Sequence, residues 1–248
     1  MTPLVAAADT ADARDKGLMV RCTDVRFSWP GSRRFTLDIP SLRIARGRRV
    51  LLLGPSGTGK STLLSLLAGI VAPDNGAIEI AGENLSRLSP AARDRHRAER
   101  LGIIFQMFNL LPYGRAIDNV LLALQFAPAR RARASREGSA YTEALRLLGR
   151  LGIDDTLARA TSAQLSVGQQ QRVAAARALI GQPDVVIADE PTSALDRARQ
   201  RDFLSLLSDE VAASDATLIM VSHDETMVDA FDEVLHLESL IASSEAPQ

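Results

Sequence analysis

The sequence has little cysteine, few aromatic residues and almost no net charge. A single cysteine, Cys22, excludes a disulfide framework within the chain and fits a reducing compartment. Aromatic residues make up 4% of the 248 residues, and 29 Lys and Arg are balanced by 30 Asp and Glu, which gives a formal net charge of −1. A dedicated nucleic-acid-binding protein is usually strongly basic. We therefore expect no nucleic-acid partner.

Long apolar runs are also missing. No window approaches the roughly 18 apolar residues that a membrane-spanning helix needs, and the N-terminal stretch has no basic region before its apolar patch, as a signal peptide would. Hydrophobic residues still make up 46% of the chain, enough for a sizeable core. We expect flexible tails at 1–16 and 240–248, one folded domain over 17–239, and no direct membrane span. Any membrane association is expected to come through a partner.

Short apolar runs separated by Gly and Pro predict strands. The region 18–53 is rich in them, and further buried strands are expected at 101–105, 184–190, 216–223 and 234–237. Near-continuous apolar runs of this kind are typical of parallel strands that are covered on both faces. Since helical stretches alternate with these strands, the pattern predicts an α/β fold with a mostly parallel sheet.

Residues 107–182 differ in character from the rest of the chain. Helical segments are expected at about 117–127, 138–151 and 166–181, joined by Gly, Pro and the Arg-rich stretch 129–136. We interpret 107–182 as a helical insertion and the arginines as a solvated face, with a partner or lipid contact as the alternative.

The most specific motif is a glycine-rich loop, GPSGTGKST, between the apolar run 50–53 and a helical stretch. It matches the phosphate-binding pattern G-x-x-x-x-G-K-[ST] in the required strand–loop–helix context. Backbone N–H groups of such a loop surround phosphates, while Lys60 brings a positive charge and Ser61 offers a hydroxyl to Mg²⁺. The predicted nucleotide ligands are Gly54, Pro55, Ser56, Gly57, Thr58, Gly59, Lys60, Ser61 and Thr62.

Polar residues follow three of the predicted strands. Asp189 and Glu190 end the run at 184–190, where carboxylates of a parallel strand face the ligand crevice. Asp189 suits Mg²⁺, and Glu190 can orient or deprotonate an attacking water. Gln106 can hold the metal or the water, and His223 can donate to the γ-phosphate. Taken alone, Gln106 and His223 would be ordinary loop residues; beside a phosphate loop they become candidate catalytic groups.

The stretch LSVGQQQR at 165–172 is a second helix start that suits an anion. Ser166 is a candidate N-cap, and Gln169 stands three places on, as a capping box requires. The free N–H groups of a helix N-terminus favour a phosphate. A chain with one nucleotide pocket has no evident need for two such helix starts.

Together these motifs resemble the nucleotide-binding subunit of ATP-binding cassette (ABC) transporters. In that family's terms they are the Walker A loop, the Q-loop Gln106, the signature LSVGQ (165–169), Walker B (VVIADE, 185–190) and the switch His223, joined by the D-loop SALD (193–196). They stand in the family's order across about 18–238. The resemblance implies a P-loop NTPase core of mostly parallel sheet, an N-terminal antiparallel β-subdomain and an inserted helical subdomain. It also implies ATP hydrolysis with ATP and Mg²⁺, the metal being held by Ser61, Gln106 and Asp189.

The resemblance also explains the second helix start. In the family, two cassettes pair head to tail, and ATP lies between the Walker A loop of one and the signature of the other. A homodimer is therefore expected, in which three signature residues and one D-loop residue meet the partner's nucleotide: Ser166, Gly168, Gln169 and Asp196.

Two positions depart from the family's usual pattern. Val167 replaces the first glycine of LSGGQ. If Ser166 is the N-cap, residue 167 is the first helical position, where valine with a negative φ is tolerated; a weakened signature is the alternative. The adenine-stacking aromatic of the family is usually Tyr, and here Phe27, or less favourably Trp29, holds the matching place.

Within the family, the stretch 103–122 resembles ATPases that serve FtsX-type permeases. The resemblance implies that residues 107–122 contact an integral membrane permease and place the protein at the cytoplasmic face of the inner membrane. We expect Phe108, Leu110 and Leu111, beside Tyr113, to make this contact. The alternative is that these side chains fill the helical subdomain's own core. A cassette of an importer, or a soluble ABC ATPase without a permease, is the competing function.

Overall fold

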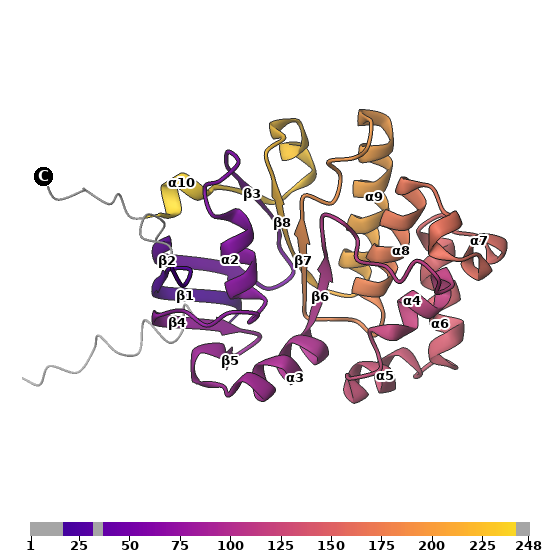
Figure 1. The fold of residues 1–248 in the computed structure, drawn as a ribbon, viewed down its shortest axis with the longest axis horizontal. Helices are drawn as coiled ribbons and strands as arrows, with labels where there is room; N and C mark the ends of the chain where they lie inside the picture. Colours follow the sequence, from indigo (N-terminus) through magenta and orange to yellow (C-terminus); the bar gives the residue numbers. More distant parts are fainter. Residues whose placement is uncertain (1–16, 32–36, 242–248) are drawn as a thin grey trace, which may run out of the picture.

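The computed structural model describes residues 17–31 and 37–241 (Figure 1). Its first layer is an antiparallel sheet with the strand order β2-β1-β4-β5. The strands are β1 (Leu18–Phe27), β2 (Leu37–Ala45), β4 (Asn75–Ile80) and β5 (Glu83–Asn84). Pro40 lies inside β2, which is tolerated because β2 is an edge strand and needs no N–H on its outer side.

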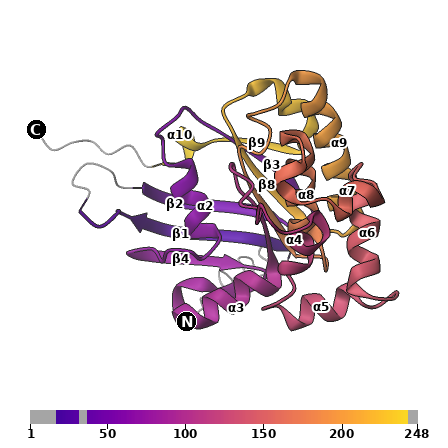
Figure 2. The same cartoon turned by 45° about the vertical axis from the view of Figure 1, so that its right-hand side comes forward.

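The second sheet is parallel, with the strand order β6-β7-β8-β3-β9. Its strands are β3 (Arg49–Leu53), β6 (Leu101–Ile104), β7 (Val185–Asp189), β8 (Thr217–Ser222) and β9 (Glu233–His236). The antiparallel sheet and the helices α4–α7 lie on opposite sides of it (Figures 1 and 2). The predicted α/β fold with an N-terminal antiparallel layer and a helical insertion is confirmed.

Alternate side chains of the parallel strands feed two separate cores. In β3, Leu51 and Leu53 pack with residues of α8 and α9, whereas Val50 and Leu52 pack with α2 and the antiparallel sheet. Both faces of the sheet are therefore covered, which explains the near-continuous apolar runs of its strands.

Three of the helices match the predicted segments of the insertion: α4 (Ala116–Leu122), α6 (Ala140–Arg150) and α8 (Val167–Leu179). Three other helices were not predicted from the sequence: the short α5 (Pro128–Ala134) and α7 (Asp155–Arg159), and α9 (Arg197–Ala213). The other helices are α2 (Lys60–Leu67), α3 (Pro90–Arg100) and α10 (Leu237–Leu240), with 3₁₀ turns η1 (Leu85–Arg87), η2 (Ser162–Gln164) and η3 (Glu225–Ala230).

The Arg-rich stretch is only in part the solvated face that we expected, because Arg131 and Arg136 are exposed but Arg130 is buried. Arg130 is 3% exposed, and its guanidinium donates to the carbonyl oxygens of Ala178 and Ile180 at the end of α8 and of Leu101. Helix C-termini leave carbonyl oxygens unsatisfied and carry partial negative charge, so a buried guanidinium is stabilised there without a carboxylate. Arg130 thereby fastens α5 to α8 and β6, while burial lowers the pKa of its guanidinium to about 10.

The predicted tails lie outside the described residues, except for Leu240 and Ile241, which pack against the core of the antiparallel side. Among residues 17–31 and 37–241, no helix is both long enough and apolar enough to cross a membrane.

Candidate nucleotide site

The predicted functional groups come from neighbouring strand ends. In the register of the parallel sheet, Leu53 of β3 pairs with Ser222 of β8, and Val221 of β8 pairs with Asp189 of β7. The residues that follow these strands therefore meet at one edge of the sheet, which is where ligands of open α/β sheets bind.

The glycine-rich loop closes around its own lysine. The Nζ atom of Lys60 donates to the carbonyl oxygens of Gly54 at 2.7 Å and Pro55 at 2.9 Å. Gly59, the N-cap of α2, has φ 101°, and Gly57 has φ 85°, conformations that favour glycine. The loop therefore leads directly into a helix N-terminus, with Lys60 as the first helical residue.

A cleft of about 410 Å³ lies above this loop. It is lined by Trp29, Ser56, Gly57, Gly59, Lys60, Ser61, Thr62, Gln106, Asp189 and Glu190. The structure thus brings together six of the nine predicted loop ligands with the three predicted metal ligands. Burial raises the pKa of the Asp189 carboxyl, and a hydrogen bond with Ser61 acts in the opposite direction.

Glu190 is held between a histidine and a lysine. Its Oε2 atom lies 3.1 Å from Nδ1 of His223, and its Oε1 atom lies 3.7 Å from Nζ of Lys60. The backbone of Glu190 has φ 43°, an unusual conformation for a residue with a side chain, and its N–H donates to the carbonyl oxygen of Val221. The prediction that Gln106, Glu190 and His223 act in catalysis is untested by this geometry, although Gln106 and Glu190 line the cleft and His223 contacts Glu190.

The aromatic residue that lines the cleft is Trp29 and not Phe27, the one that the sequence favoured. Phe27 is 5% exposed and packs edge-on against Trp29, with 5.1 Å between the ring centroids. Trp29 is 42% exposed, lines the cleft and donates its indole N–H to Oγ1 of Thr62 at 3.1 Å. Phe27 fills the core because it is the inward-facing last residue of β1, so Trp29 is the better placed of the two.

The signature begins a helix, as predicted. The hydroxyl of Ser166 accepts from the N–H of Gln169, and the side chain of Gln169 accepts from the N–H of Ser166, which completes the capping box. Val167 is the first residue of α8 and has no positive φ, so the prediction of a helical valine with negative φ is confirmed. A Cβ at Gly168 would lie 3.6 Å from Leu195, an ordinary contact. Nothing within the single chain requires glycine at position 168.

The signature and the D-loop do not line the cleft. None of Ser166, Gly168, Gln169 and Asp196 is among its lining residues. Asp196 instead caps α9, where its carboxylate accepts from the N–H groups of Ala198 and Arg199; the bond with Arg199 is the main reason why the pKa of Asp196 is low.

The segment after Gln106 divides into buried and exposed parts. Phe108 is 7% exposed and belongs to the core around α4 and α8, so the expectation that its ring contacts a permease is wrong. Phe108 and Asn109 both have positive φ, 57° and 50°, so the chain turns sharply at the buried ring. Leu110 packs partly against the same core, while Leu111 is exposed and Tyr113 is 78% exposed. These last two remain available at the surface.

Asn119, which the sequence analysis did not single out, holds this segment in shape. Its buried amide accepts from the N–H of Leu111 and donates to Ser162 Oγ and to the carbonyl oxygens of Leu111 and Arg115. Its one sequence signal was a polar residue on the apolar face of a predicted helix.

Comparison with known proteins decides the family. A model described as "ABC transporter" matches residues 37–193. The chain belongs to the ABC transporter family. Among relatives of this ABC cassette, the lipoprotein-releasing system ATP-binding protein LolD of Pseudomonas syringae pv. tomato is 39% identical over 197 residues, which cover 79% of this chain and 84% of LolD. The macrolide export ATP-binding/permease protein MacB of Hyphomonas neptunium is 38% identical over 226 residues, covering 86% of this chain but 33% of MacB.

Solved ABC cassettes have the same fold. The dimeric structure of a post-hydrolysis state of the ATP-binding cassette MJ0796, bound to ADP and Pi, superposes with a TM-score of 0.75 at 29% identity, covering 88% of this chain and 94% of that one. A second dimeric MJ0796 structure gives a TM-score of 0.74 at 28% identity, covering 88% and 95% of the two chains. This ABC cassette is therefore an ATP-binding domain whose family hydrolyses ATP.

Proposed function

We propose that the chain is one half of a dimeric ATPase that drives an FtsX-type permease from the cytoplasmic face of the inner membrane. One observation supports the dimeric ATPase above the others: the cleft holds the phosphate loop and the predicted metal ligands, while the signature lies outside the cleft. A second copy of the chain supplies the missing signature, and ATP is then bound between the two copies. The dimeric MJ0796 structures support this arrangement.

In this proposal the loop holds the phosphates. Lys60 exchanges its carbonyl partners, Gly54 and Pro55, for phosphate oxygens. The oxygens of Ser61, Asp189 and Gln106 face one cleft and are of the kind that Mg²⁺ prefers, so these residues fit the ion. Bound there, Mg²⁺ would neutralise charge on the phosphates.

Glu190 and His223 are the hydrolytic pair. The carboxylate of Glu190 orients and deprotonates the attacking water. His223 holds that carboxylate through Nδ1, 3.1 Å away, and in its doubly protonated form donates from its other ring nitrogen to the transferred phosphate. Trp29, rather than Phe27, stacks on the adenine, because its ring is exposed at the cleft and is held by Thr62.

The composite site is tested with two linked variants. Glu190→Gln keeps the shape of the side chain but cannot take a proton, so it should bind ATP, turn over no ATP and elute as a dimer in gel filtration with ATP. Adding Gly168→Asp should leave ATP binding by the monomer intact and abolish the dimer, because the new carboxylate meets the partner's phosphates. A double variant that still dimerises with ATP would contradict the proposal.

The permease surface is assigned to a groove that includes Leu122, the last residue of 107–122; neither Leu111 nor Tyr113 lines this groove. A groove of about 670 Å³ runs between α3, β6 and α4, with Phe105, Leu122 and Phe126 as apolar walls and Arg95 and Arg97 at its rim. Exposed apolar side chains gathered near a groove mark protein partners. The similarity to LolD and MacB favours an FtsX-type partner over an importer or a soluble ABC ATPase. Co-purification of a membrane protein with the tagged chain from detergent-solubilised cells separates these functions.

A further inference from the structure

Gln200 joins two segments that carry the proposed catalytic residues. It lies in the first turn of α9 and is buried. Its Nε2 atom lies 3.1 Å from Oγ1 of Thr192 and 3.2 Å from Oδ2 of Asp224. Thr192 stands two residues after Glu190, and Asp224 directly follows His223. Gln200, a side chain of α9, therefore connects the segment that follows Glu190 to the segment that follows His223.

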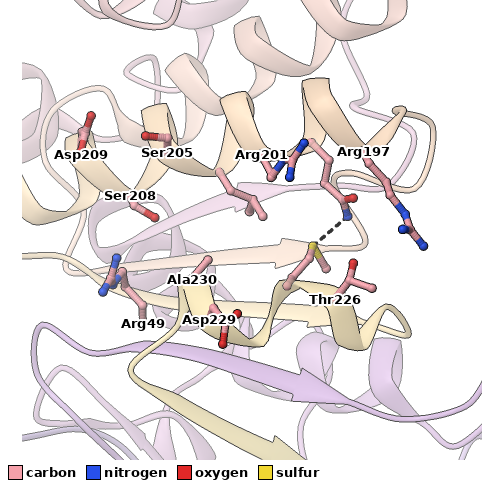
Figure 3. Close-up of a pocket in the computed structure, with 12 residues that line it drawn as sticks. Arg49, Arg197, Arg201, Ser205, Ser208, Asp209, Thr226, Asp229 and Ala230 are labelled. Atoms are coloured by element: carbon pink, nitrogen blue, oxygen red, sulfur yellow. Dashed lines mark hydrogen bonds between the residues drawn. The ribbon is translucent and has the colours of Figure 1, made fainter.

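The orientation of the Gln200 amide is fixed by its partners. An ionised carboxylate only accepts hydrogen bonds, so the group that faces Asp224 must be the NH₂ and not the carbonyl oxygen. The same nitrogen also contacts Sδ of Met227 at 2.9 Å, the dashed line in Figure 3. Thr192 donates its own hydroxyl to Met227, which leaves the oxygen of Thr192 free to accept from Gln200.

The backbone at Glu190 needs such a restraint. A non-glycine residue with φ 43° persists only where its surroundings hold it. On one side the N–H of Glu190 is held by Val221 of β8; on the other, the turn that follows contains the bond from Leu195 N–H to Thr192 O. Gln200 links this turn to Asp224, next to His223, and Thr192 itself donates to Met227 further along the same segment.

Gln200 does not contact the nucleotide cleft. It lines a different cleft of about 580 Å³ between α9 and η3, where Arg197 and Arg201 of α9 lie across from Thr226 (Figure 3). A role in ATP binding is therefore excluded by position, and any effect of Gln200 on turnover must pass through the residues that it holds.

We propose that Gln200 is a positioning residue for ATP hydrolysis, which sets the geometry between Glu190 and His223 through Thr192 and Asp224. The inference rests on the proposed roles of Glu190 and His223. Because small misplacements of catalytic groups cost up to about 100-fold in rate, loss of this link should lower kcat while the KM for ATP, set by the phosphate loop, stays unchanged.

The test compares Gln200→Met with the parent and with Ser208→Ala, a control on the same helix and in the same cleft. Methionine keeps the length and volume of glutamine without its donor. We expect kcat to fall about 10- to 100-fold with a KM for ATP within about twofold of the parent, and the control to match the parent. A purely structural role would lower the melting temperature without this split between kcat and KM. A kcat within twofold of the parent would overturn the proposal.

Thr192→Val removes the acceptor from the other side and tests the same bond if Gln200→Met does not fold. It should lower kcat to a similar extent, and the double variant should be no slower than the slower single one, because both remove one link. Fully multiplicative losses would contradict the shared bond. Glu190→Gln is assayed in parallel: if it is inactive while Gln200→Met is normal, only the positioning role fails, whereas normal turnover by Glu190→Gln defeats the proposed function itself.

Discussion

The carboxylate of Glu190 and the imidazole of His223 lie 3.1 Å apart at the ends of two neighbouring parallel strands. Neither residue is near the other in sequence, and the contact exists because β7 and β8 pair in register. In the proposed mechanism this contact lets the histidine orient the carboxylate that takes the proton from water.

His223→Ala should lower kcat by about 100-fold or more, the usual contribution of a positioned acid–base group. ATP affinity should stay within a few-fold, since the phosphate loop is unchanged. Phosphate release under saturating ATP and a binding titration measure the two quantities. His236→Ala is the matched control, because His236 also ends a strand of the parallel sheet, β9 beside β3, and does not line the nucleotide cleft. A normal rate for His223→Ala would remove the residue from the mechanism.

Trp29 is the chain's single tryptophan, so its fluorescence reports directly on the proposed adenine contact. ATP should change the emission of the parent. Trp29→Ala should weaken ATP binding by roughly 10-fold, since stacking of a base on an aromatic ring contributes about 1–3 kcal/mol. Phe27→Ala should instead destabilise the fold by about 3–5 kcal/mol, because it empties a core position. If ATP leaves the emission unchanged, the assignment of Trp29 is wrong.

Positions 167 and 168 should respond in opposite ways. Val167→Gly should leave turnover within a few-fold of the parent, because Val167 already has ordinary helical geometry. Gly168→Asp should abolish turnover without lowering the melting temperature, because a Cβ at 168 meets only an ordinary contact inside the single chain. Steady-state ATPase assays and thermal melts on the two variants suffice. A large gain in activity from Val167→Gly would show that the parent signature is impaired.

The permease contact is tested at exposed residues, with Phe108 as the contrast. The double variant Leu111→Ser and Tyr113→Ser should lower permease-stimulated ATPase and spare basal activity, because both side chains are exposed. Phe108→Ser should reduce both activities together through loss of stability, by several kcal/mol (~3–5 for a buried aromatic). Equal loss of basal and stimulated activity in the double variant would argue against a docking surface here.

The sheet edge with the proposed catalytic residues was predictable because each strand and the polar residue that follows it can be read from a short stretch of sequence. Each apolar run ends in a polar residue, and parallel strands carry these ends to one edge, so Asp189, Glu190 and His223 could be placed together without coordinates. The capping box at Ser166 is equally local, since its two partners are three residues apart.

Features that depend on distant contacts could not be predicted. The arginine at 130 looks solvated in sequence, and its burial follows from carbonyl groups 48 and 50 residues away. Phe108 and Tyr113 are both aromatic residues in a loop, yet Phe108, at a turn with positive φ at 108 and 109, is buried, and Tyr113 is exposed. Trp29 reaches the cleft because β1 delivers it beside α2, a packing relation that residue spacing does not record.

Helix α8 carries a functional feature near each end. Its N-cap, Ser166, belongs to the signature, and Arg177 in its last turn donates to the carbonyl oxygens of Phe108 and Asn109, just after Gln106. An α-helix rises about 1.5 Å per residue, so these ends are roughly 16 Å apart on one stiff rod. Because Arg177 holds the loop after Gln106, a tilt of α8 at the signature also moves that loop. In the proposed assembly, the helix thereby connects the signature, where the second copy binds, directly to the loop after Gln106.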